Sequence, residues 1–537
     1  MNSATEDFYR ISKAVIDTLL AQDPVEATWL GDHRFDSDLP NMSADHMTQF
    51  AVTLEDFLTE LDAVDDVELS HSDLVDLEIL RAQILKVHFE VTQVQQYLWN
   101  PMVWNPGTAL HLLLARDFAP ENDRMDSVRS RAAKIPDFLV TARKTLGVMS
   151  AIHVETAIAQ MQGTLNLVQS LDVPDEIAQA IAEHIDWLSE QIPVATRSPR
   201  MGSELYSGIL WHALDDASDV SVLKDEANAH LDEVNSSMRA VAMEYAREAG
   251  IDPGSDLVRT VLDHIAANAP VTNDSVLDLV EKAVTASREF TVSHELVSVP
   301  DIVTEVIEMP EIHRGVAVAY CDAPGPMETA QVPTFVAVSP TPADWSSERQ
   351  VSFYREYNAV QIHDLTIHEA FPGHVLQLAH SSRGDTSPVR KFGMSGAFVE
   401  GWAVYVEEVM VKAGYCPEAS NLSHLAIRMQ QLKMQARMTI NALLDIGVHT
   451  EHMTEDEAMN LMQIRGFQEE GEAAGKWRRA LLTAGQLPTY FVGYRAVKEL
   501  AHDLRVMHSD WSWQQIHDLM LSFGSPAPRY VRELVGL

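Results

Sequence analysis

Basic residues are scarce in this chain of 537 residues. Asp and Glu number 79 against 39 Lys and Arg, which gives a formal net charge of -40 at pH 7. A field of that sign repels phosphate backbones and anionic membrane surfaces, so we expect neither nucleic acid nor a membrane as a partner. A solvated acidic surface that aids solubility explains the charge more simply than recognition of a cationic partner does.

Cysteine is also scarce. Cys321 and Cys416 could form at most one disulfide bond, which excludes the class of small secreted domains built on disulfides and favours a reducing compartment. A secretory signal has a basic region followed by an apolar region, and the first twenty residues show no such pattern. No apolar run approaches the roughly 18 residues that are typical of a membrane span. We therefore predict a cytoplasmic protein.

The composition is otherwise globular, because 46% of the residues are hydrophobic and 22% are charged. Segments 73–99 and 175–192 place apolar residues at spacings of three and four, which predicts amphipathic helices. Short β-branched runs separated by turn residues predict a small sheet at about 298–340. We expect a mainly α protein with a helical N-terminal part, 1–290, and a catalytic part, 291–537, that contains the sheet.

The motif H-E-A-F-P-G-H begins at His368 and resembles a zinc-protease motif with unusual spacing. In the common form, H-E-x-x-H, the two histidines share one helical face. Here His374 follows six residues after His368, and on a continuous helix their side chains would diverge by about 120°. Pro372 disrupts the helical hydrogen bonding, and Gly373 tolerates backbone conformations that other residues avoid. We predict a helix break that brings both imidazoles to one side.

A catalytic zinc ion usually has three protein ligands and one open position. Glu400 lies 26 residues after His374 on a predicted helix, and we expect it to be the third ligand after His368 and His374. Glu407 lies seven residues further on the same face, where it could orient a ligating histidine. Glu369 would then be the base that takes a proton from zinc-bound water.

The segments HEAFPGH, FVEGWAVYVEE and GQLPTYFVG resemble successive signatures of the bacterial domain-of-unknown-function 885 family. Weaker similarity extends over nearly the whole chain, from EATWLGDHRFDSDLP to LMLSFGSPAP. The resemblance implies a zinc metallopeptidase related to the gluzincins, with a mostly helical, deep-clefted fold similar to carboxypeptidase Taq and angiotensin-converting enzyme. It implies metal ligands at His368, His374 and Glu400 and a catalytic base at Glu369.

Further polar residues have two interpretations each. Tyr490 occupies the aromatic position of the family pattern G-Q-x-x-x-Y-x-x-G, where a phenol could donate a hydrogen bond to an oxyanion; a buried core tyrosine is the alternative. Tyr494 would share its face on a helix. His449 and Arg437 could bind a substrate carboxylate, although packing or surface roles are more common. The run TFVAVSP could offer a strand edge to a peptide, or be an interior strand.

These observations predict a zinc-dependent hydrolase of peptide or peptide-like amide bonds, in which Glu369 activates water and Tyr490 helps to hold the oxyanion. We expect the substrate to be a peptide or a small amide. The same site could act on a non-peptide amide or an ester. A catalytically silent binding protein with a structural metal is the alternative from another class, but such a protein has no need of Glu369. Exopeptidase or endopeptidase action and the oligomeric state stay open.

Overall fold

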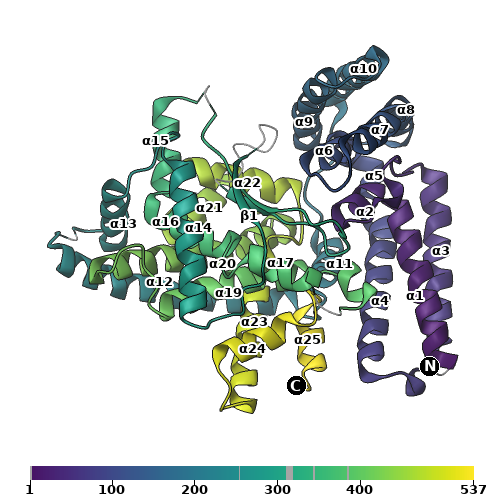
Figure 1. Ribbon diagram of the computed structural model, residues 1–537. Coiled ribbons are helices and arrows are strands. Elements are labelled where there is room, and N and C mark those ends of the chain that lie inside the picture. The colour runs from purple at the N-terminus through teal and green to yellow at the C-terminus, as the bar shows by residue number, and fades with distance from the viewer. Residues whose placement is uncertain (1–2, 253, 310–318, 343–344, 384–385) are drawn as a thin grey trace. The chain divides into compact units, whose positions relative to one another are not determined.

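The computed structural model describes residues 3–252, 254–309, 319–342, 345–383 and 386–537. These residues form two compact units: unit 1 is Met1–Pro199, Pro324–Val332 and Ser387–Gly393, and unit 2 is Arg200–Ala323, Pro333–Thr386 and Met394–Leu537. The predicted division near residue 290 lies inside unit 2. Both units are mainly helical, and the described strands form one small sheet, which confirms the predicted fold class (Figure 1).

Unit 1 consists of helices whose buried faces follow the predicted apolar spacing. The expected helices at 73–99 and 175–192 are confirmed: the first is α4 with a π turn and α5 after it, and the second is α10. The α-helices are α1 (Ser3–Gln22), α2 (Pro24–Leu30), α3 (Ala44–Asp62), α4 (His71–Phe89), α5 (Gln96–Trp99), α6 (Gly107–Ala115), α7 (Glu121–Ala132), α8 (Ile135–Thr145), α9 (Ala151–Gln169), α10 (Asp175–Gln191) and α18 (Pro388–Phe392). Shorter helical turns are η1 (His33–Phe35), η2 (Asp66–Glu68), η3 (Glu90–Val94), η4 (Pro101–Trp104) and η5 (Ile192–Val194).

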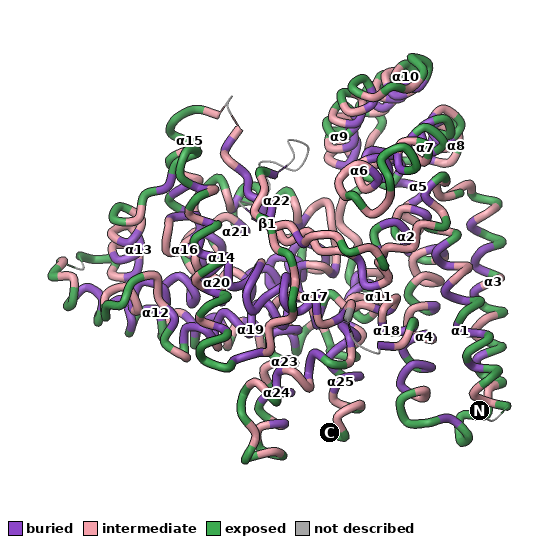
Figure 2. Tube along the Cα trace, viewed as in Figure 1, coloured by how far each residue is buried: buried purple, intermediate pink, exposed green. Residues whose placement is uncertain are grey.

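Unit 2 is organised around α20, which is buried along most of its length and packs against α12, α16, α19, α22 and α23. Figure 2 shows α19 and α20 mainly in the colour of buried residues. The helices are α11 (Ser203–Leu214), α12 (Val220–Ala249), α13 (Leu257–Asn268), α14 (Val276–Ser293), α15 (Ser347–Glu356), α16 (Ala359–Glu369), α17 (His374–Arg383), α19 (Gly396–Lys412), α20 (Asn421–Thr450), α21 (Glu455–Asn460), η7 (Leu461–Arg465), α22 (Glu470–Leu482), α23 (Pro488–Met507), α24 (Trp513–Leu521) and α25 (Pro528–Leu534).

The sheet of unit 2 contains β1 (Thr304–Glu308), β2 (Ala319–Asp322) and β3 (Thr334–Val338) in the order β1-β3-β2. β3 pairs in parallel with β1 and antiparallel with β2. The run TFVAVSP is therefore an interior strand, and its edges are not available to a peptide. Part of the predicted sheet region, at 310–318, lies outside the described residues. β2 contacts α16 and α17, which places the sheet beside the helices of the predicted metal motif.

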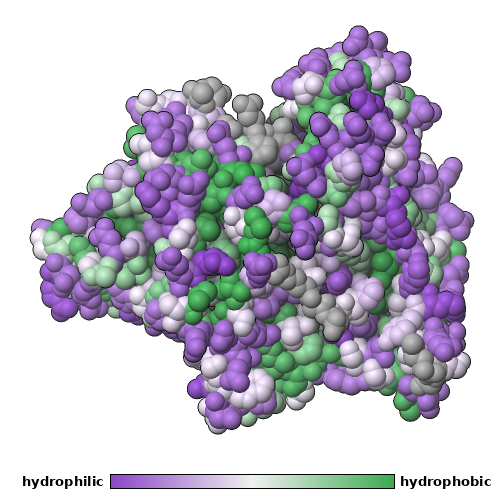
Figure 3. Space-filling view, viewed as in Figure 1, coloured by the Kyte–Doolittle hydropathy of each residue, from purple (hydrophilic) through white to green (hydrophobic). Residues whose placement is uncertain are grey.

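The surface is mainly hydrophilic on the face that Figure 3 shows, with smaller apolar areas between the hydrophilic residues. No helix among the described residues is both long and apolar enough to cross a lipid bilayer.

Candidate metal centre

The predicted helix break is present. α16 ends at Glu369 and α17 begins at His374. Ala370 leaves the helical conformation, with φ of -121° and ψ of -87°. A Cβ atom on Gly373 would lie 1.9 Å from the carbonyl oxygen of His368, so only glycine fits this close approach. The break brings the rings of His368 and His374 together, with centroids 4.8 Å apart and planes at 87°.

A buried tryptophan on α19 stabilises the helix break through a hydrogen bond. Trp402 Nε1 donates a hydrogen bond of 2.8 Å to the carbonyl oxygen of Pro372. The bond satisfies a backbone group that the interrupted helix leaves without an intrahelical partner. Tertiary packing therefore supports the conformation that the Pro-Gly pair begins.

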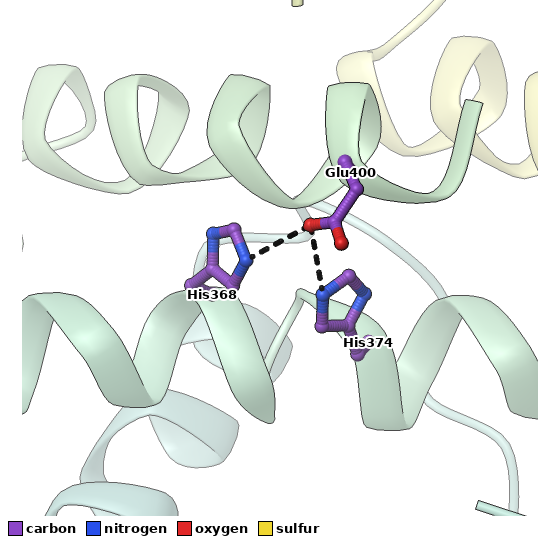
Figure 4. A group of neighbouring side chains, drawn as sticks. All are labelled: His368, His374 and Glu400. Atoms are coloured by element: carbon purple, nitrogen blue, oxygen red, sulfur yellow. Dashed lines mark ion pairs between the residues drawn. The ribbon is translucent and has the colours of Figure 1, made fainter. Parts of the chain in front are cut away.

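Glu400 on α19 completes a group of three potential metal ligands with His368 and His374. Its Oε2 atom lies 3.5 Å from His368 Nε2 and 3.6 Å from His374 Nε2 (Figure 4). One ligand atom from each residue lies within 4.8 Å of the others. Ligand atoms around a tetrahedral zinc ion with bonds of about 2.0–2.1 Å lie about 3.3–3.4 Å apart. The three side chains are thus close enough to hold one metal ion.

The two neighbouring imidazoles stabilise the ionised form of the Glu400 carboxylate. Burial raises its pKa, but the neighbouring His368 and His374 outweigh that effect and hold the pKa well below its usual range. Glu400 Oε2 is buried and has no hydrogen-bond partner among the described residues. An unsatisfied buried acceptor costs about 1–3 kcal/mol. A bound cation would remove that cost, so the residues fit a metal.

Two carboxyl groups lie behind His368. Its Nδ1 atom donates a hydrogen bond of 2.7 Å to Glu407 Oε1, which leaves Nε2 facing Glu400 and His374. This is the arrangement predicted for Glu407, and such a partner fixes the tautomer and the ring orientation of a metal ligand. Asp364, one helical turn before His368, was not predicted. Burial, followed by the charge of Glu407, raises the pKa of Asp364 well above its usual range.

Glu369 follows His368 directly and lies within electrostatic reach of it, but it does not belong to the group of three candidate ligands. Its Oε2 atom accepts a hydrogen bond of 2.9 Å from the backbone N–H of Cys321 in β2. The small sheet therefore helps to position the predicted base. Sequence reasoning missed this contact, because a main-chain donor leaves no trace in the identity of residue 321.

The two candidate tyrosines on α23 have different surroundings. The hydroxyl of Tyr490 lies 3.5 Å from Gln486 Nε2, and burial, followed by the negative charge of Glu400, raises the pKa of Tyr490. Tyr494 instead donates a hydrogen bond of 2.5 Å to Glu408 Oε2. The structure thus brings Tyr490, and not Tyr494, to the ligand group. The phenol of Tyr490 keeps its proton at neutral pH and can act as a donor.

Two glycines explain why α19 and α23 lie so close together. A Cβ atom on Gly401 would lie 2.3 Å from the carbonyl carbon of Gly493, and a Cβ atom on Gly493 would lie 1.9 Å from the carbonyl oxygen of Ala397. The two backbones are in direct contact. This contact places Glu400, next to Gly401, near Tyr490, one turn before Gly493.

The other two polar residues considered from the sequence, Arg437 and His449, both have partners within the protein. Arg437 forms an ion pair with Glu472. His449 Nε2 donates a hydrogen bond of 2.9 Å to the carbonyl oxygen of Thr483, while its Nδ1 accepts the backbone N–H of Met201 at 3.2 Å. Among the described residues, neither side chain joins the candidate ligand group.

The fold and the site together define a mainly helical protein with a His-His-Glu group, in which a broken helix supplies both histidines and a neighbouring helix supplies the glutamate. Residues 24–535 match the family model described as "Bacterial protein of unknown function (DUF885)". The chain belongs to this family, which confirms the predicted resemblance. No functionally curated protein matches the chain significantly.

Two solved structures share the fold almost from end to end. "A putative lipoprotein of unknown function from Shewanella oneidensis" is 28% identical, with a TM-score of 0.81 over 98% of this chain and 99% of that chain. "The putative lipoprotein from Colwellia psychrerythraea" is 14% identical, with a TM-score of 0.80 over 99% of both chains. The first is similar in sequence as well as in fold, and the second in fold alone.

A much weaker likeness exists to an M32 carboxypeptidase from Deinococcus radiodurans R1, which is 10% identical, with a TM-score of 0.35 over 90% of this chain and 84% of that chain. This likeness is too distant to support a statement about activity. Kinship with the gluzincins and with angiotensin-converting enzyme is not confirmed by these comparisons.

The prediction of a cytoplasmic location is wrong by the same comparisons, because both proteins that share the fold throughout are described as lipoproteins. That prediction depends on absences, namely few cysteines and no evident signal. Absences of this kind do not determine where a protein is located.

Proposed function

We propose that the protein is a zinc-dependent hydrolase of peptide or peptide-like amide bonds, with His368, His374 and Glu400 as ligands. The observation that carries the proposal is the position of Glu369, whose carboxylate is held by the Cys321 N–H and lies within electrostatic reach of His368, without being a member of the ligand group. A binding protein with a purely structural metal would need no such carboxylate. Two imidazoles and one carboxylate suit zinc and leave a fourth position open.

Zinc bound there would supply Lewis-acid chemistry, which polarises a carbonyl group and makes water a better nucleophile at neutral pH. The residues of the chain have separate roles around it. Glu369 takes a proton from the attacking water and returns it to the leaving amine. The hydrogen bond from Cys321 N–H to Oε2 fixes the orientation of that carboxylate. Tyr490 donates a hydrogen bond to the carbonyl oxygen as it gains negative charge.

A peptide screen tests this proposal. The zinc-loaded protein is incubated with a mixed peptide library that also contains simple amides and esters, and the products are identified by mass spectrometry. We expect cleavage of peptide bonds, lost after chelation and restored by zinc. Cleavage of esters alone would favour a different hydrolase, and the absence of any zinc-dependent product would contradict the proposal.

A further inference from the structure

A group of buried and half-buried charges in unit 2 contains more basic than acidic side chains. We call it the cationic cluster. Its cations are Lys433 and Arg437 on α20 and Lys476 and Arg479 on α22, and its carboxylates are Glu356 and Glu472. Four cations therefore share two carboxylates, and this imbalance lies within a protein whose net charge is strongly negative.

The ion pairs of the cationic cluster connect three of its four cations to the two carboxylates. Lys433 Nζ lies 2.9 Å from Glu356 Oε2, and Arg437 pairs with Glu472, which also lies 4.0 Å from Lys476 Nζ. Burial, followed by the charge of Arg437, lowers the pKa of Lys476 to about 7. Burial is the larger cause of this pKa shift, and the positive charge of Arg437 adds to it.

Arg479 is the cation that the carboxylates do not neutralise. It forms no ion pair with any residue in the part of the chain that the structure describes, and its Nη2 donates a hydrogen bond of 2.6 Å to Gln486 Oε1. The nearby buried Asp445 accepts instead from Tyr206 at 2.9 Å and from the backbone N–H of Gly485 at 2.8 Å. Arg479 is half-buried, so its guanidinium is partly withdrawn from water.

Gln486 links Arg479 to the candidate metal centre. The amide whose oxygen accepts from Arg479 has its nitrogen 3.5 Å from the hydroxyl of Tyr490. Tyr490 in turn lies within electrostatic reach of Glu400. One glutamine side chain therefore separates the uncompensated guanidinium from the phenol at the reaction site. Arg479 and Tyr490 thus contact opposite ends of the same amide group.

We propose that Arg479 binds the C-terminal carboxylate of a peptide substrate, so that the protein removes the last residue of the chain. The inference rests on the proposed hydrolase function. A guanidinium group recognises a carboxylate through two parallel hydrogen bonds, which a lysine cannot reproduce. The acidic surface would repel an anionic substrate, so a local excess of positive charge is needed to bind one. N-acyl amino acids carry the same carboxylate and are the competing source.

Binding of product-like probes tests Arg479 without any turnover. Isothermal titration calorimetry of the zinc-loaded full chain compares N-acetyl-L-leucine with N-acetyl-L-leucinamide, which lacks only the charge. We expect the acid to bind at least about 30-fold more tightly, as for a buried hydrogen-bonded charge pair. Arg479→Gln should bring the two affinities to within a few-fold, while Arg479→Lys should retain part of the difference. Equal affinities in the wild type would overturn the proposal.

Arg478 provides the matched control, because it is the exposed neighbour of Arg479 on the same helix and carries the same charge. Arg478→Gln should keep the preference for the acid. If Arg478→Gln and Arg479→Gln reduced that preference equally, the net charge would be responsible and the specific contact would be refuted. Circular dichroism of each variant shows whether it is folded, and Arg479→Lys serves if Arg479→Gln is not.

Cleavage assays separate this inference from the hydrolase proposal. Peptides with free and amidated C-termini are compared, together with N-acetyl-L-leucine. We expect single residues to be released from the free acid, with kcat/KM at least about 30-fold higher than for the amide. Equal cleavage of acid and amide would refute the carboxylate site and leave the hydrolase intact. Selective binding of the acid without any cleavage would refute the hydrolase and keep the site. Faster cleavage of N-acetyl-L-leucine than of peptides would overturn the assignment to peptides.

Discussion

His368 donates its Nδ1 proton to Glu407 at 2.7 Å, so that the other ring nitrogen faces Glu400. The pair spans α16 and α19, and both side chains are buried. A carboxylate behind a ligating imidazole holds the ring in place and strengthens it as a donor to metal.

Glu407→Gln should therefore lower zinc affinity by about 10- to 100-fold while leaving all three ligands in place. Competition against a chromogenic chelator measures the change. Glu499→Gln, which removes an exposed carboxylate from α23, should leave the affinity unchanged. An unchanged affinity in Glu407→Gln would mean that the hydrogen bond does not support the metal site.

Asp445 should make folding stability depend on pH. Burial raises its pKa to about 7, against about 3.9 in the unfolded chain. The folded state then binds the proton more tightly, so this contribution is fully present below about pH 4 and is lost as the pH rises to about 7, with a slope of up to about 1.4 kcal/mol per pH unit. Asp445→Asn should remove that slope. Urea unfolding of both proteins between pH 4 and 8 measures it, and parallel curves would contradict the assignment.

The contact between Gly401 and Gly493 should tolerate no side chain. Alanine at either position would meet backbone atoms of the other helix, and we expect a loss of at least about 3 kcal/mol in the free energy of unfolding, beyond ordinary overpacking. Chemical denaturation measures this loss. Gly163→Ala is the control, because a Cβ atom there meets nothing within 4 Å. A small effect in Gly401→Ala would show that α19 and α23 can separate without cost.

The helix break between α16 and α17 should also be disrupted by a side chain at Gly373. Gly373→Ala would drive a methyl group against the carbonyl oxygen of His368, so the break must change and the two histidines should diverge. We expect a lower melting temperature of the metal-free protein and a weaker zinc affinity. The hydrogen bond from Trp402 to Pro372 opposes this change. If Gly373→Ala lost stability but kept its zinc affinity, packing around Trp402 would be sufficient to keep the ligands together.

The parts of the site that were predictable depend on local chemistry. Pro372 and Gly373 disrupt a helix wherever they occur, and a spacing of seven places Glu400 and Glu407 on one face. These features follow from neighbouring residues, and the structure contains both.

The missed parts depend on contacts between distant segments. The N–H of Cys321 would be the same for almost any residue, so its bond to Glu369 has no signal in the sequence. The sequence alone does not distinguish Arg479 from its neighbour Arg478. Only the folded structure shows that Arg479 contacts Gln486. The compact units divide near residue 199, between helical segments, and residue 290 lies within α14, ahead of the sheet that begins at Thr304.

The central claim is that Glu369 acts as a base and not as a ligand. Elemental analysis of zinc, with turnover of a cleaved peptide, is to be measured on wild type, Glu369→Gln and Glu400→Ala. We expect about one zinc per chain in the wild type and in Glu369→Gln, with turnover in the latter lower by several orders of magnitude, and loss of both zinc and turnover in Glu400→Ala. Equal loss of zinc in the two variants, or unchanged turnover in Glu369→Gln, would contradict the account.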